Sequence, residues 1–238
     1  MSGLPAALAA NPSLDLWVRV DREHTITVFT GKVELGQGIA SALARIAAEE
    51  LDVAFERVRV ETADTDHGLD ERMTAGSTSM MESGSALRHA AAEARAVLLE
   101  RAATRLDAPP AALSVFDGTI TEPTGTRRTT YWELSGGRPL ERDASGAARP
   151  KSAAEHRVVG EEARNRADLH AIVSGAARFV ADLDHERLAH ARVVRPPGPR
   201  ARLVDLDEDA ARALPGVVEV VRSGSFVGVV AEREEQAI

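Results

Sequence analysis

An alternation of apolar and polar residues near the start of the chain predicts a pair of strands. The strands are residues 15–20 and 25–30, and the polar turn 21–24 joins them. A period of two places every second side chain on the same face of a sheet. We therefore expect a β-hairpin that buries one face.

Two helices with contrasting patterns are expected next. Residues 39–51 carry apolar side chains at helical steps, so one face can pack on a core. Residues 85–106 are rich in alanine and end before a Pro-Pro pair, which stops a helix. Residues 55–62, between the helices, alternate again and predict a strand. A loop of glycine and small polar residues precedes each helix, at 31–38 and 74–79.

The rest of the chain predicts a short hairpin, an irregular stretch and a second group of strands. The hairpin joins residues 113–116 to 119–121, because Asp117-Gly118 tolerates the positive φ of a type I′ turn. Residues 135–167 are rich in Gly, Pro, Arg, Glu and Ala without a period, which is typical of a linker or a crossing segment. Further candidates are strands over 176–180, 189–194, 203–206, 217–221 and 227–231, and helices starting at 131, 208 and 232.

These elements predict an α+β fold in two modules. Residues 1–134 would form a mixed βαβα module in which a strand, a small-residue loop and a helix follow one another twice. Residues 135–168 would be the linker or crossing segment, and residues 169–238 would form the second module.

Composition excludes several classes of function. Hydrophobic residues make up 44% and charged residues 28% of the 238 residues, which suits a globular protein. A net charge of −8 and only 3% aromatic residues argue against nucleic-acid binding. The absence of cysteine excludes disulfides, iron–sulfur clusters held by this chain and Cys-ligated zinc. No apolar run is long enough to cross a membrane and no secretory signal is evident, so the expected compartment is the cytoplasm.

The loop at residues 31–38 is the first candidate for ligand chemistry. It leads into a helix whose first N–H groups attract anions. Gly36 and Gly38 permit close approach of a ligand to the backbone, and Gln37 offers both an amide donor and an acceptor. A simple strand-to-helix turn explains the same glycines equally well. The spacing fits neither a Walker A loop nor the dinucleotide fingerprint.

The loop Thr74-Ala75-Gly76-Ser77-Thr78-Ser79 is the second candidate. Its four hydroxyls and one glycine offer O–H and N–H donors to a phosphate, although a helix cap accounts for them as well. Both loops could converge on one extended anionic ligand.

Other candidate sites are weak. Residues 64–71 are acidic, but the positions where a calcium loop needs Gly and Glu hold Leu69 and Ala75. His185 and His190 are five residues apart, whereas a helical metal pair needs four. No G-x-S-x-G nucleophile motif occurs.

The first loop carries a resemblance to a known family. Residues 31–38, Gly-Lys-Val-Glu-Leu-Gly-Gln-Gly, resemble the G-x-x-E-x-G-Q-G segment of molybdopterin-binding large subunits of the xanthine dehydrogenase/aldehyde oxidase family. The second module resembles that family's a/b hammerhead domain, and it follows the Gly-Gln-Gly segment as in isoquinoline 1-oxidoreductase and nicotinate dehydrogenase-type chains. The matching stretches are 48–51, 63–65, 74–77 and 83–88, then 174–179, 182–183, 190–195 and 214–218.

The resemblance implies an activity and a set of contacts. Family members oxidise an aldehyde or an N-heterocycle with water-derived oxygen on molybdenum. It implies that the cofactor is molybdopterin with molybdenum, in the cytosine dinucleotide form, and that no protein side chain binds the metal. The cofactor-binding residues would be Gly36, Gln37, Gly38, Thr74, Ala75, Gly76, Ser77 and Ser79.

The resemblance also implies partners, and the chain departs from the family pattern. The partners would be the remainder of the large subunit or a complementary chain, a small subunit with a 2Fe–2S cluster, and a small-molecule substrate, but neither nucleic acid nor a membrane. The family's catalytic Gly-Glu motif and its Gly-Gly-Phe-Gly-Gly segment have no counterpart here, and Arg72-Met73 and Ile172 also differ. We therefore assign no catalytic residue and expect the chain to be inactive by itself. Two alternatives stay open: a noncatalytic, truncated cofactor-binding or assembly module, and an unrelated phosphate-binding α/β protein.

Overall fold

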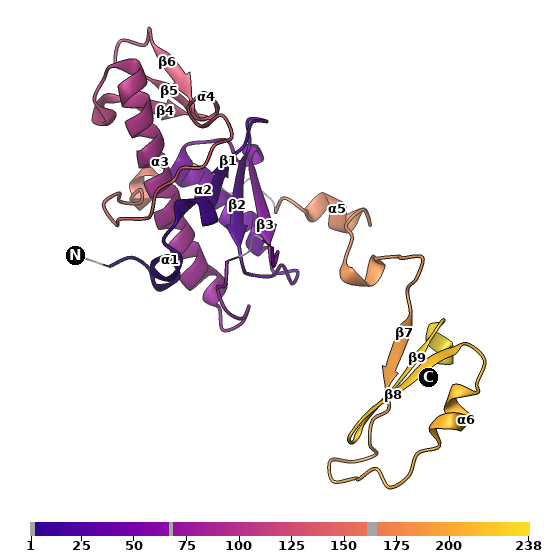
Figure 1. Cartoon of the computed structure of the whole chain (residues 1–238). Helices are drawn as coiled ribbons and strands as arrows, with labels where there is room; N and C mark the ends of the chain where they lie inside the picture. Colours follow the sequence, from indigo (N-terminus) through magenta and orange to yellow (C-terminus); the bar gives the residue numbers. More distant parts are fainter. Residues whose placement is uncertain (1–2, 67–68, 161–165) are drawn as a thin grey trace. The chain divides into compact units, whose positions relative to one another are not determined.

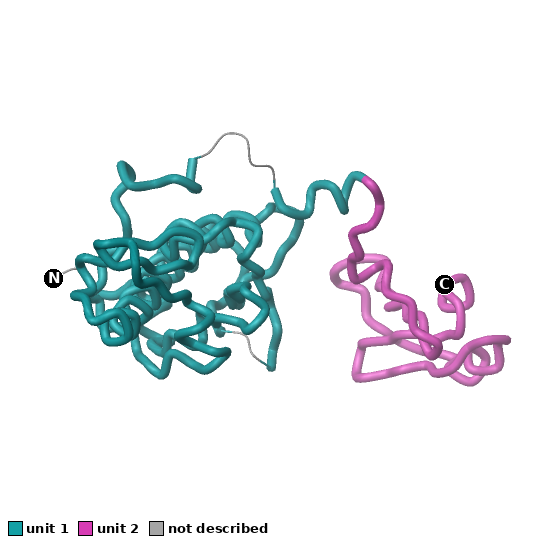
Figure 2. The backbone as a smooth tube through the Cα atoms, turned by 90° about the horizontal axis from the view of Figure 1, so that it is seen from above, with its two compact units in different colours: residues 1–173 teal, residues 174–238 magenta. Residues whose placement is uncertain are grey.

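The computed structural model describes residues 3–66, 69–160 and 166–238. These residues form two compact units, 1–173 and 174–238, which Figure 2 distinguishes by colour. Each unit combines small sheets with helices (Figure 1). The predicted α+β class is confirmed.

The first sheet of unit 1 has the order β1-β2-β3 (Figure 1). Strands β1 (Val18–Val20) and β2 (Ile26–Thr30) form the expected antiparallel hairpin. Strand β3 (Val58–Thr62) lies parallel to β2, and the helix α2 (Ile39–Leu51) is the crossover between them. Because α2 follows β2, the loop before this helix lies at the carboxyl end of β2, where α/β units commonly bind ligands.

The strands differ from the prediction in length and in burial. Leu14–Leu16 and Phe55–Arg57 are short 3-10 turns, so β1 and β3 begin later than expected. Both faces of β2 are covered, and even Thr27 and Thr30 are 2% exposed. The alternation predicted a single buried face, but other parts of the chain cover the opposite one.

The two long helices match the sequence pattern. Helix α3 spans Ser85–Leu106 as predicted, and it packs against α2. A π-helical segment, Ser79–Gly84, leads directly into α3 and was not expected. π-helical insertions are rare and frequently lie at functional sites. The short helix α1 (Ala6–Ala10) was missed as well, and its Leu8 is buried in the core.

A second small sheet follows α3 in unit 1. Strands β4 (Ser114–Phe116) and β5 (Thr119–Thr121) form the predicted hairpin, and the third strand, β6 (Arg128–Thr130), was not predicted. Asp117 and Gly118 have φ values of 46° and 71°, as a type I′ turn requires. Helix α4 (Tyr131–Ser135) begins with a capping box between Thr130 and Glu133.

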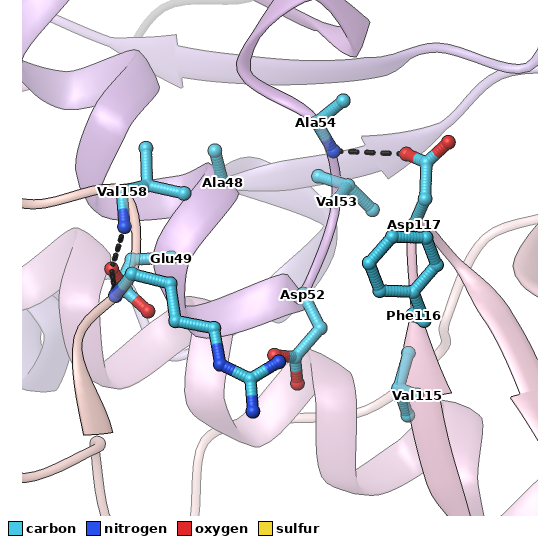
Figure 3. Close-up of a pocket in the computed structure, with 10 residues that line it drawn as sticks. Ala48, Glu49, Asp52, Val53, Ala54, Val115, Phe116, Asp117 and Val158 are labelled. Atoms are coloured by element: carbon cyan, nitrogen blue, oxygen red, sulfur yellow. Dashed lines mark hydrogen bonds between the residues drawn. The ribbon is translucent and has the colours of Figure 1, made fainter. Parts of the chain in front are cut away.

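The irregular segment after α4 is part of unit 1 and hydrogen-bonds to helix α2. Its only regular element among the described residues is the 3-10 turn Ala153–Glu155. The Glu49 carboxylate of α2 accepts hydrogen bonds from the N–H groups of Arg157, Val158 and Val159 at 2.8, 2.7 and 2.9 Å. Figure 3 shows the hydrogen bond between Val158 and Glu49 beside a pocket whose apolar lining includes Phe116. Part of the predicted segment, residues 161–165, lies outside the described residues, as do residues 67 and 68 of the acidic loop.

Replacement of Glu49 by glutamine should destabilise unit 1 in a pH-dependent manner. Burial of Glu49 favours its protonated form, but the three N–H donors outweigh burial and hold its pKa below the usual 4.5. Stability from this group is therefore present above pH 4.5 and is lost as the pH falls through the lowered pKa. We expect Glu49→Gln to reduce the free energy of unfolding at pH 7 by about 2 kcal/mol. Urea denaturation from pH 7 to pH 3 should show the difference narrowing below pH 4.5, and a pH-independent difference would contradict this.

Unit 2 contains one antiparallel sheet in the order β7-β9-β8. Its strands are β7 (His190–Val193), β8 (Val217–Ser223) and β9 (Phe226–Ala231), close to the predicted ranges. Helix α6 spans Glu208–Arg212, and the helix expected from residue 232 is a 3-10 turn, Glu234–Gln236.

Two strands predicted in unit 2 are wrong. Residues 176–180 and 203–206 contain no strand. Val180 and Val204 are 86% and 94% exposed, and within the described residues these apolar runs pair with no sheet. A strand needs a neighbour for its hydrogen bonds, and the apolar pattern alone does not supply one.

Helix α5 (Leu169–Val173) ends unit 1. None of the helices in the described parts of the chain is both long and apolar enough to cross a membrane.

Candidate cofactor-binding site

The two loops singled out from the sequence line one cavity of about 400 Å³ that is open to solvent, and Gln37, Ala75 and Ser77 are exposed in its wall. Seven of the eight predicted residues lie in its wall, and Gly36 does not. The seven residues are Gln37, Gly38, Thr74, Ala75, Gly76, Ser77 and Ser79. The rest of the lining is Leu35, Ile39, Ala42 and Met80. The carboxyl end of β2 and the π-helical start of α3 bring these residues together.

The loop before α2 is closed by Glu34. Its carboxylate accepts the N–H groups of Gly36 at 3.0 Å, Gly38 at 2.8 Å and Ala40 at 3.1 Å. Gly36 and Gly38 have φ values of +97° and +82°, a region where other residues are strained. The helix N-terminus thus attracts an anion, as predicted, but the anion is a side chain of the same loop. A ligand would have to use other donors.

Gln37 also hydrogen-bonds within this loop. Its Oε1 accepts the N–H of Leu35 at 2.5 Å, and its Nε2 donates to the carbonyl of Val33 at 2.8 Å. A carboxamide has two lone pairs on oxygen and two N–H donors. The two hydrogen bonds within the loop use one acceptor and one donor, so one of each remains for a ligand in the cavity that Gln37 lines.

The second loop presents hydroxyl groups to the cavity from an unusual backbone. Gly76 and Ser77 both have left-handed φ values, +62° and +60°. A serine in this region is uncommon, and such strain often occurs at binding sites. The hydroxyl of Thr78 donates to the carbonyl of Ala75 at 2.8 Å and holds the turn. Ser77 and Ser79 line the cavity on either side of Thr78.

Lys32 joins the two loops. Its side chain is buried, and Nζ donates to the carbonyls of Glu71 and Met73 at 2.6 and 3.1 Å and to Thr78 Oγ1 at 3.2 Å. An ammonium group can direct three donors to three separate acceptors. The N–H of Val33 adds a hydrogen bond to Thr74 Oγ1 at 2.9 Å. These contacts fix the distance between the loops.

Glu71 holds the same junction from the other side. Its Oε2 accepts Thr30 Oγ1 at 2.5 Å and the N–H of Gly31 at 2.9 Å. Glu71 is 5% exposed. Lys32 and Glu71 therefore connect the end of β2 to the start of the second loop in both directions.

Glu34, Lys32 and Glu71 support the site but were not predicted from the sequence. One signal was available for the lysine, because only two of the 29 basic residues are lysines. The other lysine, Lys151, likewise donates to a backbone carbonyl, that of Glu49, and to Asp52 Oδ1. Both lysines hold positions where a compact cation contacts several oxygens, which a planar guanidinium does less well.

The cavity is suited to binding rather than to proton transfer. Among the residues that the structure describes, no ionisable side chain is in its lining, which consists of hydroxyls, one carboxamide, backbone and apolar groups. Neutral donors around glycine-rich turns fit a ligand with phosphate and polar heterocyclic parts, as a pterin cofactor has. Within the described ranges, no cluster of three His, Asp or Glu side chains could hold a metal ion.

Comparison with known proteins identifies a family over most of the chain. The model of a family described as "Molybdopterin cofactor-binding domain" matches residues 2–187. One of the subunits of nicotinate dehydrogenase from Pseudomonas putida is 37% identical over 247 residues, which cover 98% of this chain and 21% of that protein. The beta subunit of isoquinoline 1-oxidoreductase from Brevundimonas diminuta is 28% identical over 265 residues, which cover 95% and 34%.

A third relative carries another cofactor in its name. The membrane-bound aldehyde dehydrogenase (pyrroloquinoline-quinone) of Gluconacetobacter polyoxogenes is 28% identical over 222 residues, which cover 90% of this chain and 28% of that protein. The chain thus spans about a fifth to a third of the length of these relatives. The family match extends over most of the chain and includes both loops of the cavity. The resemblance of the second module to a hammerhead domain stays a prediction. The resemblance to molybdopterin-binding large subunits is confirmed, and the chain belongs to the molybdopterin cofactor-binding domain family.

Proposed function

We propose that the cavity between the two loops binds the molybdopterin cofactor in its cytosine dinucleotide form. The observation that supports this most directly is the convergence of seven predicted residues on one cavity with a neutral, hydrogen-bonding lining. Hydroxyls and N–H groups of residues 76–79 would bind phosphate, and the free donor and acceptor of Gln37 would bind a heterocycle. Molybdenum carried by the pterin would supply redox chemistry when bound.

The chain would serve as one part of a larger oxidoreductase. By analogy with relatives named for nicotinate and isoquinoline oxidation, the substrate class would be an N-heterocycle or an aldehyde. The remainder of the large subunit, or a complementary chain, would supply the general base, because the described part of the cavity lining has none. A small subunit would hold the 2Fe–2S cluster, and the assembly would work in the cytoplasm. By itself the chain would bind cofactor without turnover.

Replacement of Ala75 by aspartate should prevent cofactor retention. Ala75 lines the cavity, and a carboxylate there would repel the phosphate groups. We expect pterin content to fall at least about tenfold, since a pair of like charges at close range opposes binding by more than about 1.4 kcal/mol. The full chain is purified from its native host, with pterin measured by fluorescence after oxidation and molybdenum by elemental analysis.

Ala112→Asp is the matched control, because it adds the same charge at an exposed 3-10 turn outside the cavity. Equal pterin content in both variants would contradict the proposed site. The proteins that co-purify with the chain distinguish a subunit of an enzyme from a cofactor-binding or assembly module. Molybdenum with a larger chain and an iron–sulfur chain indicates a split enzyme, whereas pterin on the lone chain indicates a cofactor-binding or assembly module.

A further inference from the structure

Residues 166–168 hold the outer side of the loop before α2. Arg166 Nη1 donates to the carbonyl of Gly36 at 2.7 Å. The guanidinium also lies against Gly38, where an added Cβ would be 3.7 Å from Arg166 Cζ. The N–H of Ala167 donates to Ser41 Oγ, in the first turn of α2, at 2.8 Å. This segment therefore contacts the loop and the helix that the loop begins.

Arg166 is itself fixed by Asp168. Nε and Nη2 donate to the two carboxylate oxygens at 2.6 and 2.7 Å, and Nη1 remains for the Gly36 carbonyl. This division of donors depends on the planar fork of arginine. A lysine could donate to one oxygen of Asp168 or of the Gly36 carbonyl, but it has no planar fork to bind all three in the same arrangement.

Glu34 and Arg166 act on opposite polar groups of the same loop. Glu34 accepts the N–H groups of Gly36 and Gly38, while Arg166 donates to the Gly36 carbonyl. Arg166 Nη2 lies 3.8 Å from Glu34 Oε1, so the two charges also attract each other. Neither side chain is in the cavity lining, whereas Gln37 and Gly38 are. Arg166 therefore acts on a ligand through the loop and not by direct contact.

We propose that Arg166, oriented by Asp168, is a positioning residue that sets the Gly36–Gly38 loop in the shape that presents Gln37 and Gly38 to the cavity. Its effect on the cofactor rests on the proposed function, but its effect on the loop does not. If the contacts of residues 166–168 strengthen the binding of a ligand by a given factor, the bound ligand strengthens those contacts by the same factor. The segment leading to unit 2 is in this way coupled to occupancy of the cavity.

Amide hydrogen exchange of the full chain tests the positioning role without cofactor. Arg166→Gln removes the donor to Gly36 and the pair with Asp168. We expect the N–H groups of residues 34–40 to exchange about tenfold faster, while exchange in α3 stays unchanged. Arg142→Gln is the matched control, because Arg142 forms an exposed pair with Glu100 at 3.4 Å and does not contact the loop.

Two further measurements complete the test. Arg166→Lys keeps the charge but not the fork, so its loop exchange should resemble that of Arg166→Gln; exchange equal to the unmodified chain would overturn the proposal. Arg166→Gln should also lose bound pterin faster than Arg142→Gln. Unchanged loop exchange in Arg166→Gln, or equally faster exchange throughout α2 and α3, would overturn the positioning role. If the unmodified chain holds no pterin, the proposed function fails, and the exchange data still decide the role of Arg166.

Discussion

Lys32→Met should lower the free energy of unfolding of unit 1 by about 3 kcal/mol, because three oxygens lose a charged donor in a buried place. The side chain is 1% exposed, so water does not readily replace the ammonium group. Methionine restores the volume, but the carbonyls of Glu71 and Met73 are left without their donor. Urea denaturation followed by tryptophan fluorescence measures this, since Trp17 and Trp132 are both buried in unit 1.

Arginine at position 32 should not restore stability. The guanidinium is larger and planar, so it cannot direct donors at both carbonyls and at Thr78 Oγ1 from the same buried position. Arg59→Met is the control, because Arg59 is an exposed basic residue on β3 and its removal should change stability by less than about 0.5 kcal/mol. If Lys32→Met lowers the free energy of unfolding no more than Arg59→Met does, Lys32 does not join the loops.

Gly31→Ala should lower the free energy of unfolding of unit 1 by about 4 kcal/mol, more than any other substitution proposed above. The added Cβ would clash with backbone atoms, which cannot move away as a flexible side chain can. An added Cβ would be 1.9 Å from the carbonyl oxygen of Leu69 and 3.1 Å from the nitrogen of Glu71. The chain at residues 69–71 would have to move away from β2. This movement would also break the Glu71 contact with the N–H of Gly31 and separate the two loops.

Gly3→Ala is the matched control for the alanine substitution, because it lies in the same unit as the two tryptophans. A Cβ at Gly3 meets no atom within 4 Å, and its φ is not in the left-handed region. Alanine there should be neutral or slightly stabilising, since it restricts the unfolded chain. Fluorescence-detected denaturation and pterin content report the stability and the site separately. A Gly31→Ala chain as stable as the unmodified chain would show that the 69–71 segment moves without penalty.

Local pattern by itself determined the two long helices, the two hairpins and the positions of the two loops. The predictions match the structure to the residue for the helices 39–51 and 85–106 and for the Asp117-Gly118 turn. Their signals, which are periodicity, prolines and positive φ, act over a few residues. Seven of the eight predicted cofactor-binding residues lie together because each loop precedes a helix of one compact unit.

Tertiary structure decided everything that depends on groups distant in the chain. The strands predicted at 176–180 and 203–206 do not form, because a strand exists only where a neighbour supplies hydrogen bonds. The anion at the α2 N-terminus is Glu34, and the segment read as a linker or a crossing contributes Arg166 to the loop. Lys32 reaches oxygens 39 to 46 residues away. The sequence states which charges exist, whereas only the folded chain determines which buried oxygens and N–H groups need them.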